Sequence, residues 1–220
     1  ALLVVLFQLE RQDRVSTNVF GGLIAALEAN APIAVVNGVR LTSEDLAENT
    51  EQLALTATAQ GLNTEDPAVQ AEISNQALDI MINTLLLEQA AAERSIVVGD
   101  EEVQARITEL EESAGGAEAL AARLAEFDIG QEQLVSDVQE ELLIRTLLDQ
   151  VFADTEVVVT EEEIQEVYDN AVVASGGQPL PPLEEVQIQI EAQLTQAKEQ
   201  EALDVYLESL RADADIELNP

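Results

Sequence analysis

The side chains most able to do chemistry in this sequence are its carboxylates. Asp and Glu number 44 among 220 residues, and some stand in adjacent runs, such as Glu161–Glu163 and Glu184–Glu185. Paired carboxylates can act as general acid and base, or bind Ca²⁺ where a loop supplies further oxygen ligands. Neither run has the spacing of a calcium loop, and in so acidic a chain adjacent acids arise by chance. We therefore predict no catalytic residue, no metal site and no cofactor.

Other kinds of reactive site are excluded by the residues that are missing. The chain has no cysteine and no histidine, so it has no disulfide, no thiolate nucleophile and no imidazole acid or base. The glycine-rich segments "SAGG" and "SGG" lack the lysine and the flanking strand of a phosphate-binding loop. No serine stands in a nucleophile elbow. The sequence therefore predicts a binding protein rather than an enzyme.

The charge of the chain is strongly negative. Nine Lys and Arg residues oppose the acids, giving a net charge of −35. Such a field repels nucleic-acid phosphates and anionic membrane surfaces, so we expect no nucleic-acid partner. Salt screens the repulsion between like charges and so stabilises a folded chain this acidic, which suggests a halophilic source. An ordinary acidic exported protein is the alternative.

The elements that carry these acids are predicted to be helices. Ala, Leu, Glu and Gln favour helix, and similar start signals recur. Thr42 and Thr160 can cap a first turn whose third residue is acidic, Gly99 and Gly130 precede similar turns, and Asp66 stands before a proline. The predicted helices span residues 43–59, 67–93, 100–113, 117–127, 131–152, 161–173 and 184–211.

Three short strands are predicted at the two ends of this helical region. Ile33–Val36 and Val39–Leu41 flank Asn37-Gly38, a dipeptide typical of a tight hairpin turn. Ala214–Leu218 is a third strand, which we expect to pair with the hairpin and so bring the chain ends together. The predicted fold class is mainly α, a multi-helix domain with a small sheet formed by an N-terminal hairpin and a C-terminal strand.

Five segments in order resemble one protein family. They include "VVNGVRLTSEDL", a helix carrying Ile82, Leu86, Leu87 and Ala90, the helix starts at Val98 and Val159, "YDN" at Tyr168, and the closing "YLESLRADADIEL". Together they resemble the N-terminal chaperone domain of SurA/PrsA-type periplasmic folding factors. The resemblance implies that residues 31–220 form a SurA N-like chaperone domain, with residues 184–220 as its closing helix and strand.

The family's prolyl-isomerase domain is not expected in this chain. In the family, a parvulin domain is inserted before the closing helix, and its chemistry uses histidines. Here residues 171–183 carry two glycines and three prolines, which suit a short loop. A plain loop that never held an insert is the alternative. We therefore predict a chaperone domain without isomerase activity.

The predicted function is that of a holdase, a non-enzymatic extracytoplasmic chaperone that binds unfolded secreted or outer-membrane polypeptides. A scaffold that binds a fixed partner or oligomerises through its long helices is the alternative, and a prolyl isomerase is a third. Client contacts are predicted for apolar side chains that remain after the apolar face of each helix is assigned to the core. Each of these side chains could instead belong to the core. These are Phe127, Ile129, Leu147, Val151, Phe152 and Tyr168.

The first 30 residues are predicted to be a separate segment. "ALLVVLF" at residues 1–7 is too short to span a membrane, and it fits the end of a signal peptide, an anchor or a first core helix. As an anchor it would tether the protein to a membrane in the periplasm or another extracytoplasmic space. As a swapped helix it would support a homodimer.

Overall fold

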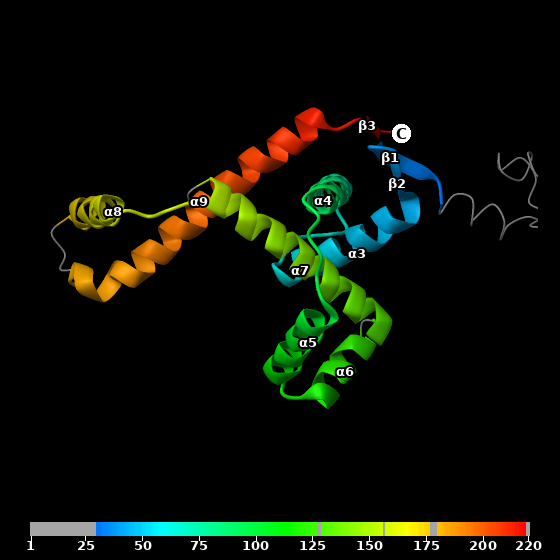
Figure 1. Cartoon of the computed structure of the whole chain (residues 1–220), viewed down its shortest axis with the longest axis horizontal. Helices are drawn as coiled ribbons and strands as arrows, with labels where there is room; N and C mark the ends of the chain where they lie inside the picture. The colour runs from blue at the N-terminus through cyan, green and yellow to red at the C-terminus, as the bar shows by residue number, and fades with distance from the viewer. Residues whose placement is uncertain (1–29, 127–128, 156, 177–179, 219–220) are drawn as a thin grey trace, which may run out of the picture. The chain divides into compact units, whose positions relative to one another are not determined.

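The computed structural model describes residues 30–126, 129–155, 157–176 and 180–218 (Figure 1). Within these ranges the chain is mainly α, as predicted, with seven helices and a three-stranded antiparallel sheet. The elements are β1 (Pro32–Val36), β2 (Val39–Thr42), α3 (Ser43–Ala59), α4 (Pro67–Glu93), α5 (Asp100–Ala114), α6 (Ala117–Glu126), α7 (Gln131–Asp154), α8 (Glu161–Ala174), α9 (Leu183–Asp213) and β3 (Ile216–Leu218).

The described chain divides into two compact units. The first contains the residues up to Leu86 together with those from Asp213 onward, and the second contains Leu87–Ala212. Helix α4 begins in the first unit and ends in the second. The proposed segments 1–7 and 1–30 lie outside the described residues, except for Asn30.

In the first unit the two ends of the described chain meet in one sheet, as predicted. The strand order is β2-β1-β3, and Val36 pairs with Ile216 in the antiparallel register. Asn37 turns the hairpin with φ of 50°, a left-handed conformation that Asn tolerates. Its Oδ1 accepts a hydrogen bond from the Asp215 amide at 2.8 Å, and its own amide donates to the Asp215 carbonyl at 2.8 Å. Asn37 therefore serves both the hairpin turn and the attachment of the C-terminal strand.

The predicted capping signals set the helix starts. At α3, the Asp45 amide donates to Thr42 Oγ1 at 3.3 Å, and the Thr42 amide donates to the Asp45 carboxylate at 3.0 Å. At α4, the Ala68 amide donates to Asp66 Oδ1 at 2.8 Å. Each bond satisfies an amide that the first helical turn leaves without a partner. The closing strand begins two residues later than predicted, at Ile216.

Two hydrophobic clusters hold the second unit together, and α7 contributes to both. The first joins Leu87, Ala90 and Ala91 of α4 to Leu147 and Val151 of α7, with Tyr206, Leu207 and Leu210 of α9 packed against it. The second joins Val98 and two residues of α5 to Val138 of α7. Helix α7 therefore positions α4, α5 and α9 within this unit.

Candidate functional site

The predicted client-contacting side chains divide between core and surface. Leu147 is fully buried and Val151 is 2% exposed, and both belong to the first core cluster. Phe152 is half-buried against that cluster, and Ile129 and Tyr168 are also half-buried. Phe127 lies outside the described residues. A client-binding role for these residues stays a prediction.

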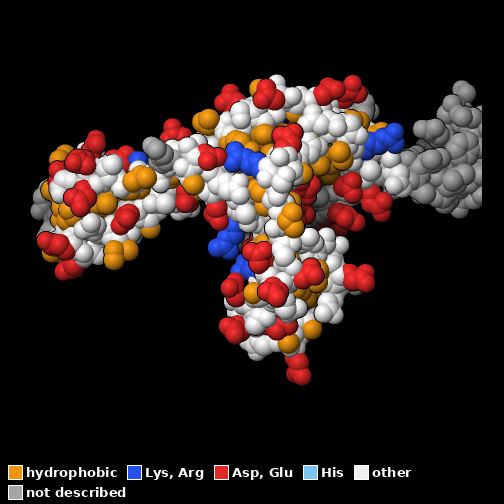
Figure 2. Space-filling model, viewed as in Figure 1, with side chains coloured by type: hydrophobic (Ala, Val, Ile, Leu, Met, Phe, Trp, Pro, Cys, Tyr) orange, Lys and Arg blue, Asp and Glu red, His pale blue; other side chains and the backbone are white. Residues whose placement is uncertain are grey.

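An open groove lies in the second unit between the C-terminal end of α7, the segment that follows it, and α9. Its volume is about 470 Å³, and we call it the α7–α9 groove. It is lined by Val151, Thr155, Val157, Lys198, Glu201, Ala202, Val205, Tyr206 and Ser209. Val205 is 63% exposed, so an aliphatic side chain of the groove is open to solvent. Figure 2 shows hydrophobic side chains at the surface of the α8–α9 region with acidic side chains between them.

The end of α7 shapes one wall of this groove. Thr155 ends the helix, and its Oγ1 donates to the Val151 carbonyl at 2.8 Å. The Val157 amide then donates to the Phe152 carbonyl at 3.1 Å, which satisfies one of the last carbonyls of the helix. The three valines at 157–159 have no regular secondary structure, and they lead to Thr160, the N-cap of α8. Val157 therefore lies beside the C-terminal end of α7.

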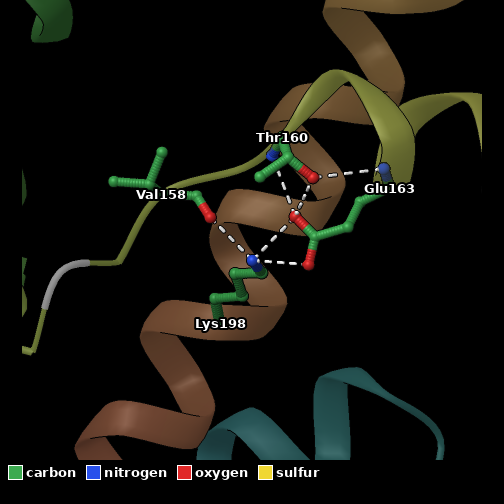
Figure 3. Close-up of polar contacts among 4 residues, drawn as sticks. All are labelled: Val158, Thr160, Glu163 and Lys198. Atoms are coloured by element: carbon green, nitrogen blue, oxygen red, sulfur yellow. Dashed lines mark hydrogen bonds and ion pairs between the residues drawn. The ribbon is translucent and has the colours of Figure 1, made fainter.

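Lys198, the single lysine of the chain, ties α9 to this returning segment (Figure 3). Its Nζ lies 2.7 Å from Glu163 Oε1 and donates to the Val158 carbonyl at 2.6 Å. The Thr160 amide donates to Glu163 Oε2 at 2.8 Å, completing the capping box of α8. The Lys198 ammonium, followed by the Thr160 amide, lowers the pKa of Glu163 to about 2. The groove is therefore flanked by a fixed ion pair rather than by a free cation.

A second polar contact connects α7 to α9 through Arg94. Arg94, just after α4, lies 2.9 Å from Asp154 at the end of α7, and its guanidinium stands 5.9 Å from the centre of the Tyr206 ring. A cation at that distance is attracted by the aromatic ring, and the Asp154 carboxylate holds it in place. These contacts fix Tyr206, one of the groove residues.

The groove side chains offer apolar contacts and one ion pair. Lys198 and Glu163 neutralise each other, and the other groove side chains are aliphatic, hydroxyl or exposed acid. Among the described residues, no group of three or more acidic side chains could hold a metal ion. Within the same part of the chain, no helix has the length and hydrophobicity that crossing a membrane requires.

Comparison with known proteins identifies the family. Residues 15–148 match the model of the SurA-like N-terminal domain, which is more than half of the chain. The chain belongs to the SurA-like N-terminal domain family. Membership indicates a chaperone role, and this domain is not a catalytic one. The match extends from before β1 into α7, so the matched residues do not include α8 and α9.

Two individual proteins are also similar to this chain. A trigger factor from Nostoc sp. (strain PCC 7120) is 26% identical in an alignment of 167 residues that covers 71% of this chain and 32% of that protein. The chain thus spans about a third of the length of this curated relative. A solved structure from work on PEB4 and Cj1289, SurA-like chaperones of Campylobacter jejuni, superposes with a TM-score of 0.60. It is 13% identical, and the superposition covers 86% of this chain and 99% of that one, so the two share a fold.

Several groove residues were not anticipated from the sequence. The groove is lined by Val157, Lys198 and Val205 among others. Their positions in the sequence do not identify them as groove residues. Two signals were present: the valine run 157–159 ahead of a capping box, and the single lysine on a helix rich in acids. Neither signal shows which neighbour the side chain meets, because the partners are tens of residues away.

Proposed function

We propose that this chain is a non-enzymatic extracytoplasmic chaperone that holds unfolded secreted or outer-membrane polypeptides in the α7–α9 groove. The observation that carries the proposal is an open groove with Val157, Ala202 and Val205 among its lining residues, in a domain of a chaperone family. An aliphatic groove removes apolar client surface from water without requiring a fixed sequence. The chaperone likeness of the solved relative supports an extracytoplasmic site of action, because that work describes a periplasmic protein.

The net charge supports the same role. At −35, the free protein and its complexes repel one another, which opposes aggregation of a loaded complex. Acidic side chains lie between the exposed hydrophobic ones in Figure 2, so apolar surface can be offered to a client without a large continuous patch.

The test measures how well the purified protein suppresses aggregation of an unfolded outer-membrane protein on dilution from urea. We expect suppression at stoichiometric amounts, and we expect Val205→Glu to weaken it several-fold by placing a charge in the groove. Val173→Glu is the matched control, because Val173 is 81% exposed and lies outside the groove. Absence of suppression by the unmodified protein would refute the holdase function. Equal effects of the two substitutions would leave the function standing but exclude this groove as the site.

A second candidate function is a scaffold that binds a fixed partner or a second copy of itself. Val173 on α8 and Ile188 on α9 are each 81% exposed and lie outside the groove, so they are free to meet a partner. Light scattering of the free protein, followed by titration with unfolded client, separates the two functions. A stable dimer that ignores the client supports the scaffold. Turnover of a prolyl peptide above background would instead reveal an isomerase.

A further inference from the structure

A second groove in the second unit combines aliphatic and uncharged polar side chains with charges of only one sign. It lies between the end of α4, the connection to α5 and the N-terminal half of α7, and its volume is about 330 Å³. It is lined by four aliphatic, two uncharged polar and two acidic side chains: Ile96, Val97, Val98, Leu143, Ser136, Gln139, Glu88 and Glu140. We call it the α4–α7 groove.

The local sequence turns one valine outward into this groove. Ser95 has φ of 58°, and the Ile96 amide donates to the Ala91 carbonyl at 3.0 Å, as in a left-handed helix C-cap. This turn sends Ile96 against the first core cluster and leaves Val97 84% exposed, while Val98 is buried in the second cluster. An aliphatic side chain so exposed beside a groove provides apolar contact for a ligand.

The two carboxylates of the groove have no ion-pair partner in the part of the chain that the structure describes. Within the described ranges, neither Glu88 nor Glu140 forms an ion pair, whereas Glu109, Glu141, Asp154 and Glu163 each have one. Partial burial, and then the charge of Glu140, raises the pKa of Glu88. Partial burial, and then the charge of Asp137, raises the pKa of Glu140. Two half-buried like charges therefore stand together, and no ion pair within the described residues offsets either of them.

We propose that the α4–α7 groove binds client segments in which an arginine or lysine is flanked by aliphatic residues. The ligand's cation would lie between Glu88 and Glu140, and its aliphatic neighbours would cover Val97 and Leu143. Charge complementarity selects this occupant, since a cation relieves both the burial of the two carboxylates and their mutual repulsion. The proposal rests on the chaperone function, and it gives that function a client preference for basic-apolar segments.

The test compares two fluorescent peptides, one with alternating leucine and arginine and one in which citrulline replaces each arginine. Citrulline keeps the shape of arginine and removes its charge. We expect the arginine peptide to bind the protein more tightly, by roughly tenfold if the charge pairing is partly desolvated. Fluorescence anisotropy at fixed salt gives the dissociation constants.

The decisive variants are Glu88→Gln and Glu140→Gln. Glu93→Gln and Glu132→Gln are matched controls, because they make the same charge change at exposed positions on the same two helices, α4 and α7. We expect the arginine preference to fall to near unity in the double groove variant and to persist in the double control. Thermal melting checks folding, and the groove variants should melt no lower than the unmodified protein, because they remove half-buried charge.

Three results would overturn the proposal: equal arginine preference in all proteins, equal loss in groove and control variants, or no binding of either peptide. The first would place the site elsewhere, and the second would assign the preference to the total charge. Aggregation suppression of the outer-membrane client is measured in parallel with each variant. If suppression persists while the preference is absent, the proposed function stands and only the preference for basic segments fails.

Discussion

Replacement of Leu147 by alanine distinguishes a core residue from a client contact. Leu147 is fully buried in the cluster that joins α4 to α7, with Leu87 and Val151 as fellow members. The substitution removes three buried carbons, which at about 0.8 kcal/mol per methylene accounts for roughly 2.4 kcal/mol of transfer free energy. The cavity left between two helices adds to this loss, so we expect the free energy of unfolding to fall by about 3–4 kcal/mol.

The measurement is urea unfolding followed by tyrosine fluorescence. The chain has two tyrosines and no tryptophan, and Tyr168 and Tyr206 both lie in the second unit, so the signal reports on that unit alone. Val173→Ala is the control, because Val173 is 81% exposed and its truncation should change the free energy by less than about 0.5 kcal/mol. Leu147→Val should lie between the two.

The same variant tests the assignment of Leu147 to the core. Under conditions where Leu147→Ala remains folded, we expect it to suppress client aggregation as well as the unmodified protein does. A loss of suppression with a fall in stability below about 1 kcal/mol would refute the reasoning, since no cavity in a packed core costs so little. Leu147 would then contact clients directly, as the sequence allowed.

Two further predictions concern polar contacts. As pH falls from about 4.5 toward about 2, protonation of Glu163 should break its pairing with Lys198, so the second unit should lose stability there and keep it above that window. In thermal melts over this pH range, Glu163→Gln should make the melting temperature less dependent on pH, whereas Glu162→Gln should not. An unchanged pH dependence in Glu163→Gln would contradict the assignment. Asn37→Gly should keep the left-handed turn and lose the hydrogen bond from the Asp215 amide. The free energy of unfolding should fall by roughly 1 kcal/mol, and the Asp215 amide should exchange its hydrogen faster. Unchanged exchange would show that the Asn37 side chain does not hold β3.

Much of the fold could be predicted because its signals are local. Thr42, Asp66 and Thr160 mark helix starts by bonding to amides within three residues, and the structure begins α3, α4 and α8 at those places. The Asn37-Gly38 turn is equally local, because it depends on the left-handed conformation of two adjacent residues. The third strand was also predicted from its own residues, but its pairing with the hairpin was only an expectation, since the Asp215 amide and Asn37 Oδ1 that join them are 178 residues apart along the chain.

The candidate sites could be predicted less well, because burial depends on partners distant in sequence. Leu147 and Val205 are both aliphatic residues on long helices, and their own segments do not tell them apart. One is fully buried because α4 covers it, and the other is 63% exposed beside a groove. Likewise, many glutamates in this chain resemble Glu88 and Glu140, and only their shared groove distinguishes those two.

The sequence by itself determined the helix boundaries, the hairpin, the absence of histidine and cysteine chemistry, and the strong negative charge, because each depends on composition or on contacts within a few residues. Tertiary structure decided which apolar side chains reach the surface and which acids lack a cation. Both outcomes depend on side chains brought together from helices that are far apart in the chain, as the pairing of Lys198 with Glu163 shows.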